Sequence, residues 1–148
     1  MPGLKTYHDG HNIYSVDMMI AYINIHKPTV LVMPVDDFVD QLKVDVWGDV
    51  SPMVVIEKIH LKKYASNAAR IHDADLSYPI IVSKDGVIID GYHRLAKAVL
   101  SGTTTIKTYV LDDALMKKFI LDKHMDFVHV HQHMTVSNVL ELWSKRFC

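Results

Sequence analysis

Cysteine and long apolar runs are nearly absent from this sequence, and each absence excludes a class of protein. The single cysteine, Cys148, is the last of 148 residues, which excludes an intrachain disulfide and suits a reducing compartment. No stretch approaches the roughly 20 apolar residues of a membrane-spanning helix, and no signal peptide opens the chain. We therefore expect a soluble, intracellular (cytoplasmic) protein without a membrane partner.

The chain also lacks an excess of charge of either sign. Its 16 basic and 17 acidic side chains give a formal net charge of −1, with histidine counted as neutral. Among the first 50 residues, seven side chains are acidic and three are basic. Because proteins that bind duplex DNA usually present a basic face, the composition argues against DNA as a partner.

What remains is the composition of a globular domain, with 49% hydrophobic and 22% charged residues. At this length we expect a single domain over residues 1–148. Its predicted parts are an N-terminal helical extension (1–50), a motif-bearing core (51–123) and a C-terminal strand and helix (124–148).

Helix and strand signals alternate along the chain, which predicts an α/β or α+β fold with a small mixed sheet flanked by helices. Capping side chains predict helix starts at Ser15, Asp36, Ser51, Asp112 and Thr135. Runs rich in β-branched residues predict strands over 29–35, 78–83, 87–89 and 105–111. Asp85-Gly86 is typical of a two-residue type I′ hairpin turn between two of these strands.

The residues from 87 to 102 combine a buried strand, a glycine turn and a helix. Val87–Ile89 is a short β-branched run, and Gly91 permits a close or left-handed backbone. Helical spacing begins with Leu95, and Gly102 stands where a C-cap glycine belongs.

The first turn of this predicted helix contains Tyr92, His93 and Arg94. Unpaired N–H groups and the positive end of the helix dipole favour an anion there. Arg94 adds a permanently charged fork of donors that suits phosphate. The alternative is that Gly91 is only a turn residue and Arg94 a solvated surface charge.

This stretch resembles a known signature. Residues 90–98, Asp-Gly-Tyr-His-Arg-Leu-Ala-Lys-Ala, are similar to the Gly-x-x-Arg-x-x-Ala phosphate motif of the ParB/sulfiredoxin superfamily. Sulfiredoxins carry Gly-Cys-His-Arg at this place, and the ParB-like free serine kinases carry Asp-Gly-His-His-Arg. The resemblance covers about residues 78–111, under a quarter of the chain, and includes Tyr-Pro-Ile-Ile-Val at 78–82.

The resemblance implies a nucleotide-binding domain of the ParB/sulfiredoxin type. Gly91, Tyr92, His93 and Arg94 would hold the phosphates of ATP, CTP or ADP, with the base left open. A carboxylate at Asp90, directly before the turn, can bind a magnesium ion that bridges to phosphates or accept a proton from a hydroxyl. The kinase-like members, which this sequence resembles, use the matching aspartate catalytically. Nucleotide hydrolysis or phosphotransfer would then follow, whereas in a protein that only binds nucleotide the aspartate caps the turn.

Two further candidates and one exclusion come from the same resemblance. In ParB-like domains the segment before the first motif strand also approaches the nucleotide, so Arg70 and His72 are candidates for that approach. A local salt-bridged surface is the alternative for both residues. Tyr92 stands where sulfiredoxins have their reactive cysteine, and because a phenol cannot perform thiolate attack, sulfiredoxin activity is excluded.

Three histidines alternate near the C-terminus, at His129, His131 and His133. On a strand they would face one side, and imidazoles so placed can bind zinc, copper or nickel. No cysteine or nearby carboxylate pair completes the ligand set, so we favour the polar face of an edge strand or loop and expect no transition metal.

Two other classes of function stay open. The first is a DNA-associated ParB-like partition or nuclease module, although the roughly 37 residues after Leu111 show too little helical pattern for a helix-turn-helix. The second is a structural or interaction protein that has lost its ligand. Solitary ParB-like domains are common in phages, large DNA viruses and mobile elements, which implies a viral or mobile-element origin (host cell or virion).

Apolar residues near both chain ends predict a homodimer, since exposed apolar patches mark interfaces. They are Met18, Met19, Tyr22, Phe119, Leu142, Trp143 and Phe147.

We expect no tight binding to duplex DNA at physiological salt, because the near-zero net charge leaves few phosphates to neutralise. The measurement is a fluorescence-anisotropy titration of a labelled duplex at several salt concentrations. Submicromolar binding that weakens steeply with salt would contradict this expectation and favour the DNA-associated module.

Overall fold

The structure is a computed structural model that describes residues 4–123 and 125–148, and the chain divides into two compact units. The terminal unit combines the described residues up to Pro28 with those from Asp112 onward, and the central unit is Thr29–Leu111. These boundaries differ from the predicted ones at residues 50 and 123. Both units mix helices and strands, so the predicted mixed α/β class is confirmed.

The described strands of the central unit form a mixed sheet in the order β3-β6-β4-β5. β4 runs antiparallel to β5 and parallel to β6, and β3 runs antiparallel to β6. The strands are β3 (Leu31–Pro34), β4 (Ile80–Ser83), β5 (Ile88–Asp90) and β6 (Thr105–Leu111). The helical elements are α2 (Pro52–Glu57), α3 (Ala65–Asp73), α4 (Tyr92–Leu100) and the 3₁₀ turns η1 (Val35–Asp37), η2 (Val39–Lys43) and η3 (Lys62–Tyr64).

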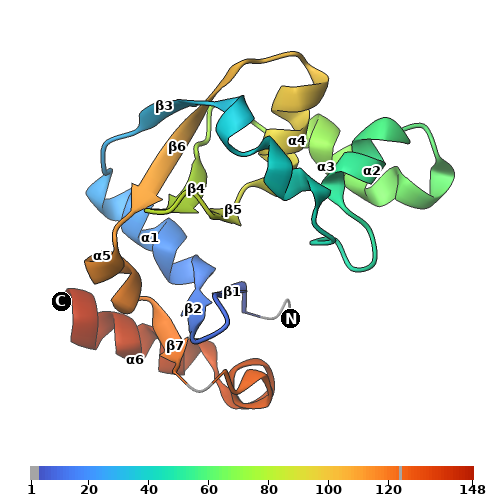
Figure 1. Ribbon diagram of the computed structural model, residues 1–148. Helices are drawn as coiled ribbons and strands as arrows, with labels where there is room; N and C mark the ends of the chain where they lie inside the picture. The colour runs from blue at the N-terminus through green and yellow to red at the C-terminus, as the bar shows by residue number, and fades with distance from the viewer. Residues whose placement is uncertain (1–3, 124) are drawn as a thin grey trace. The chain divides into compact units, whose positions relative to one another are not determined.

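The core of the central unit lies between one face of this sheet and α4. Leu95 and Ala98 of α4 pack against inward-facing strand residues, namely Ile80, Val82, Ile88 and Ile106. A second, smaller core of Val55, Ile71 and Ala96 joins α2, α3 and α4, which lie side by side (Figure 1). The helix α4, which begins within the motif at residues 90–98, therefore packs against both the sheet and two neighbouring helices.

Local sequence signals act at three places in the central unit. The Ser51 hydroxyl accepts a hydrogen bond from the Val54 N–H at 3.2 Å, and Pro52 is the first residue of α2. Gly102 follows α4 with a left-handed φ of 70°. Pro34 lies in β3, which is an edge strand, where a missing N–H removes no ladder bond.

Two local predictions are wrong. Asp36 does not cap a helix, because it lies inside the 3₁₀ turn η1, which starts at Val35. The predicted short helical segment exists as η1 and η2, with Phe38 and Leu42 buried. The side chain of Gln41 in η2 donates to the Gly86 carbonyl at 2.7 Å and accepts from the Ile88 N–H at 2.8 Å. The Gln41 side chain thus pairs two backbone groups beside the edge strand β5.

The second wrong prediction is the type I′ hairpin. The Gly86 N–H donates to the Ser83 carbonyl at 3.0 Å, which makes Lys84 and Asp85 the central turn residues. Type I′ needs a positive φ at both central residues, whereas here Gly86 has φ 80° and Asp85 does not take a positive φ. The loop is a three-residue connection closed by a left-handed glycine.

The terminal unit contains the antiparallel sheet β1-β2-β7 in its described residues. Its strands are β1 (Thr6–His8), β2 (Ile13–Ser15) and β7 (Ile120–Asp122). Its helices are α1 (Val16–His26), α5 (Asp113–Lys117), the π-helical turn η4 (His129–His133) and α6 (Val136–Phe147). Ser15, Asp112 and Thr135 each accept a hydrogen bond from the N–H three residues later, so the three predicted helix starts are confirmed.

Two predictions about the terminal unit need correction. The N-terminal region is not only helical, since β1 and β2 form a hairpin. His129, His131 and His133 lie on the π-helical turn η4 rather than on a strand. The two-residue alternation that would place three imidazoles on one side therefore does not apply.

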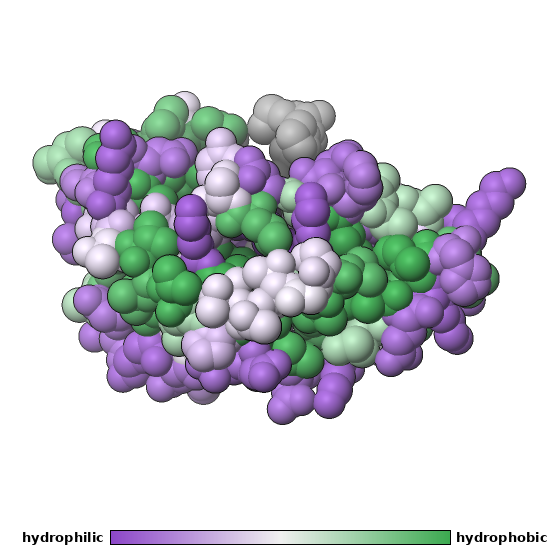
Figure 2. Space-filling model, turned by 90° about the horizontal axis from the view of Figure 1, so that it is seen from above, coloured by the Kyte–Doolittle hydropathy of each residue, from purple (hydrophilic) through white to green (hydrophobic). Residues whose placement is uncertain are grey.

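The described surface keeps many apolar side chains. In the view of Figure 2, hydrophobic patches alternate with hydrophilic side chains. Met18, Met19 and Phe119, three of the residues that motivated the dimer prediction, are buried. Leu140 of α6, which was not among those residues, is 61% exposed. No helix within the described residues is long and apolar enough to cross a membrane.

The β1–β2 hairpin is closed by the carboxylate of Asp9. This side chain accepts from the N–H groups of His11 (2.9 Å) and Asn12 (2.8 Å) and from the Tyr14 hydroxyl (2.7 Å). Burial acts to raise the pKa of Asp9, but the hydrogen bonds from Asn12, Tyr14 and His11 outweigh it and lower the pKa.

We expect Asp9 to make the stability of the protein depend on pH. Because the folded-state pKa lies below the unfolded value, the stabilisation is present above about pH 4 and is lost as pH falls through the folded pKa. Thermal denaturation at several pH values should show wild type losing stability in this acid range relative to Asp9→Asn, which keeps a side-chain carbonyl. Parallel profiles for the two proteins would contradict this expectation.

Candidate functional site

Asp90 ends β5 and begins the turn that leads into α4. Its backbone pairs with Ile81 of β4, and the residue is 8% exposed. A buried carboxylate needs a charged or hydrogen-bonding partner. The guanidinium of Arg94 lies 3.8 Å from the Asp90 carboxylate, at i+4, and supplies the opposite charge.

Gly91 connects the two elements in a conformation that other residues rarely adopt. Its φ is 118°, and it precedes the first residue of α4. A β-carbon at this position would lie 2.5 Å from Cγ2 and 2.8 Å from Cβ of Ile80. The predicted close approach therefore exists, but the group that comes close is the Ile80 side chain of β4.

Arg94 reaches back across the turn to the start of β4. One of its terminal nitrogens donates to the Pro79 carbonyl at 2.7 Å, while the other faces Asp90. At 3.8 Å the second contact is an ion pair too long for a hydrogen bond. The Arg94 side chain is 27% exposed, so the guanidinium is anchored by one N–H and partly open to solvent.

The two residues before Arg94 are also held by neighbouring elements. The His93 ring lies 3.1 Å from the Asn67 side-chain oxygen of α3 and stacks on Trp47, with 4.4 Å between ring centroids. Tyr92 is partly buried against the core of the central unit. Sequence reasoning missed Trp47 and Asn67, because neither belongs to the motif and only the fold brings them to it.

Arg70 and His72, the two candidates outside the motif, belong to α3. Arg70 is exposed, and the imidazole of His72 lies 3.1 Å from the Asp73 carboxylate, with both side chains largely in solvent. Within the described residues no hydrogen bond or ion pair joins either side chain to the Asp90–Arg94 turn.

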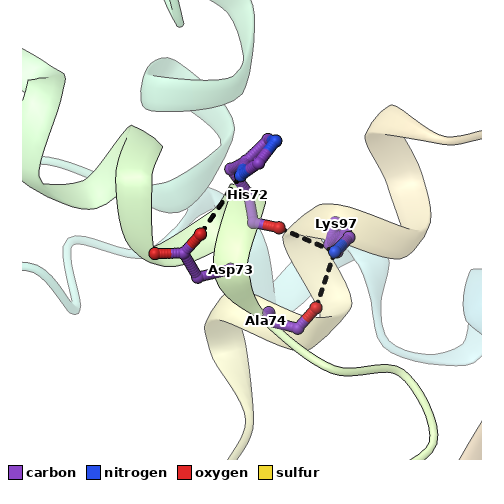
Figure 3. A network of polar contacts seen from close by, with 4 residues as sticks. All are labelled: His72, Asp73, Ala74 and Lys97. Carbon is purple, nitrogen blue, oxygen red and sulfur yellow. Dashed lines mark hydrogen bonds and ion pairs between the residues drawn. The ribbon is translucent and has the colours of Figure 1, made fainter.

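Lys97, one turn after Arg94 on α4, is a second basic residue that sequence reasoning overlooked. Its ammonium donates to the carbonyls of His72 (2.7 Å) and Ala74 (2.6 Å), at the end of α3 (Figure 3). A cation at a helix C-terminus satisfies its last carbonyls and complements the dipole. The i, i+3 spacing from Arg94 could have placed Lys97 on the same face of the helix.

Asp75 lies on the segment that follows α3, and its carboxylate accepts a hydrogen bond from the Ser77 N–H at 2.9 Å. Hydrogen bonds from Ser77 lower the pKa of Asp75, and the charges of Lys97 and Arg94 lower it further. The segment that joins α3 to β4 therefore follows α4, with the carbonyls of Ala74 and Pro79 accepting hydrogen bonds from its two basic side chains.

Among the histidines of η4, His131 has contacts with two side chains of the terminal unit. His131 lies 3.4 Å from the Thr6 hydroxyl and stacks on Phe127 with an interplanar angle of 4°. Within the part of the chain that the structure describes, no group of three His, Cys, Asp or Glu side chains is arranged to hold a metal ion.

Comparisons of the chain with protein-family models, with curated proteins and with solved structures found no match. The likeness to the ParB/sulfiredoxin superfamily therefore rests on residues 78–111 alone.

We expect Gly91→Ala to destabilise the protein by about 2–5 kcal/mol, because the strained φ and the overlap with Ile80 add together. Gly102→Ala is the matched control, since Gly102 also has a positive φ but a β-carbon there would meet nothing within 4 Å. It should cost about 1–2 kcal/mol. Urea denaturation of both variants tests this, and equal losses would show that the contact with Ile80 contributes nothing.

Proposed function

We propose that this chain binds a phosphate-bearing ligand of the nucleotide class at the β5–α4 turn, from Asp90 to Arg94. The observation that supports this most is the position of Arg94 at the N-terminal end of α4. One N–H of the guanidinium donates to the Pro79 carbonyl. The other terminal nitrogen lies at ion-pair distance from the Asp90 carboxylate, which a ligand could replace, and the side chain is partly open to solvent. Phosphate oxygens could take the place of the Asp90 contact and also meet the first-turn N–H groups.

Asp90 makes magnesium relevant to this proposal. A carboxylate beside a bound phosphate would repel it unless a cation lies between them. Magnesium is commonly bound by one or two carboxylates together with substrate phosphates and water, so a single acid at this turn fits a nucleotide-bound magnesium ion. Such an ion would polarise the phosphate. Asp90 would either hold the magnesium ion or take a proton from the hydroxyl of a second substrate. We include nucleotide hydrolysis or phosphotransfer in the proposal on this basis, together with membership of the ParB/sulfiredoxin superfamily.

A second candidate is a structural or interaction protein without a ligand, and specific contacts favour it. Gly91 packs on Ile80, Arg94 bonds Pro79, and His93 is held by Asn67 and Trp47. Each motif residue therefore has a partner inside the central unit. If these contacts are the whole role of the motif, its residues serve stability and not binding.

Arg94→Ala separates the two candidates. If the turn binds phosphate, the variant should lose about tenfold to a hundredfold in nucleotide affinity, since a charge-assisted contact contributes about 1.5–3 kcal/mol. It should also lose about 0.5–1.5 kcal/mol of stability with the Pro79 hydrogen bond. Calorimetry with ATP, CTP, GTP and ADP, each with and without magnesium, measures the first effect, and urea denaturation measures the second.

Two further variants complete the experiment. Lys107→Ala, on the exposed side of β6, removes a positive charge elsewhere in the central unit and should bind like wild type. Asp90→Asn should abolish magnesium-dependent binding and strengthen magnesium-free binding if the carboxylate holds the ion. Failure of every nucleotide to bind wild type, with Arg94→Ala changing stability only, would leave the ligand-free candidate.

A further inference from the structure

A cavity of about 300 Å³, wide open to solvent, lies in the central unit between α3 and α4. Its lining residues are Ile59, Ala68, Ile71, His72, Lys97, Leu100 and Ser101. Four of the seven are aliphatic, and the other three carry an imidazole, an ammonium and the Ser101 hydroxyl, which donates to the Lys97 carbonyl at 2.8 Å. Mostly apolar walls with a few polar groups are typical of small-molecule sites, and the volume is at the lower end of their range.

The cavity begins one helical turn from the proposed phosphate site. Arg94, Lys97 and Ser101 recur at i, i+3 and i+7, which places them along one face of α4. Arg94 and Lys97 donate to carbonyls of the same segment between α3 and β4, Arg94 to that of Pro79 and Lys97 to that of Ala74. At 1.5 Å per residue, Ser101 lies about 10 Å along the helix from Arg94. A ligand of that length could touch both places.

Lys97 stands at the boundary between the two places. Two carbonyls of the α3 end hold its ammonium, as Figure 3 shows. An ammonium has three N–H donors, so one more acceptor can be served from the same position. This donor is fixed in place before any ligand arrives, which reduces the entropy that binding must overcome.

We infer that the cavity takes the nucleoside half of a mononucleotide whose phosphate lies at Arg94; this inference rests on the proposed function. Ala68 and Leu100 would face the base from the two helices, and Ile71 would form the buried floor. Lys97 would bridge base or ribose to phosphate, and His72, whose side chain is largely in solvent, would contact the outer edge. The aliphatic walls favour a flat, apolar-faced group over a bare phosphate or sugar.

The experiment compares two adjacent alanines of α3. Ala68 lines the cavity, whereas Ala69 is exposed and does not. Ala68→Leu should fill the cavity and weaken binding of AMP, CMP, GMP or UMP, whichever binds wild type most tightly, by about tenfold or more. Ala69→Leu should bind the same nucleotide like wild type. In calorimetry, ribose 5-phosphate should have the same affinity for wild type and both variants, and so should inorganic phosphate.

A measurement on the wild-type protein keeps the inference testable if Ala68→Leu fails to fold. Methyl NMR signals of Ile59, Ile71 and Leu100 should shift with the mononucleotide but not with ribose 5-phosphate. Unshifted methyl signals, or equal affinity of wild type for mononucleotide and ribose 5-phosphate, would overturn the base pocket while the phosphate site stands. If no phosphate-bearing compound binds wild type, both the pocket and the proposed function are wrong.

Discussion

The close packing of Gly91 against Ile80 is the constraint on which the candidate site depends. The backbone leaves β5 and turns into α4 at φ 118°, with no room for a β-carbon over the neighbouring strand. This contact brings the first turn of α4 close to the start of β4. Arg94 can then reach the Pro79 carbonyl, and Asp90 remains buried beside a positive charge. A larger side chain at Gly91 would displace all three groups together.

Two basic residues on one face of α4 organise the segment between α3 and β4. Lys97 holds the carbonyls of His72 and Ala74, and Arg94 holds that of Pro79. The side chains thus perform a structural task that needs only some of their donors. A guanidinium or ammonium that is already positioned by the protein binds an anion with less loss of freedom. The same contacts therefore support both a structural role and a preorganised ligand site, and only binding measurements separate the two.

The motif residues also differ in how they could contribute to chemistry. Asp90 is the acid at the turn and can act on phosphate only with a cation or a proton in between. His93 is fixed by Asn67 and Trp47, so its ring orientation is set by α3 and by the loop before α2. Tyr92 packs toward the core rather than standing as a reactive group. The described contacts of this turn are therefore an ion pair, hydrogen bonds and ring packing.

The amino-acid sequence by itself determined the local features. Ser15, Ser51, Asp112 and Thr135 begin helices as predicted, because a capping hydroxyl or carboxylate acts on N–H groups three residues away. The order of strand, glycine turn and helix around Gly91 was also predictable from neighbouring residues alone. Predictions were wrong at Asp85-Gly86, where only the glycine takes a positive φ, and at 129–133, which form a π-helical turn and not a strand.

Only the tertiary structure decided which partners the site residues have. Pro79, Asn67 and Trp47 are 15 to 46 residues from the motif residues that they contact, and no spacing rule links them. The cavity between α3 and α4 likewise depends on how two helices pack, which periodicity alone does not specify. The sequence could therefore indicate where an anion is favoured, but the packing of distant elements determines how much of Arg94 remains available to bind one.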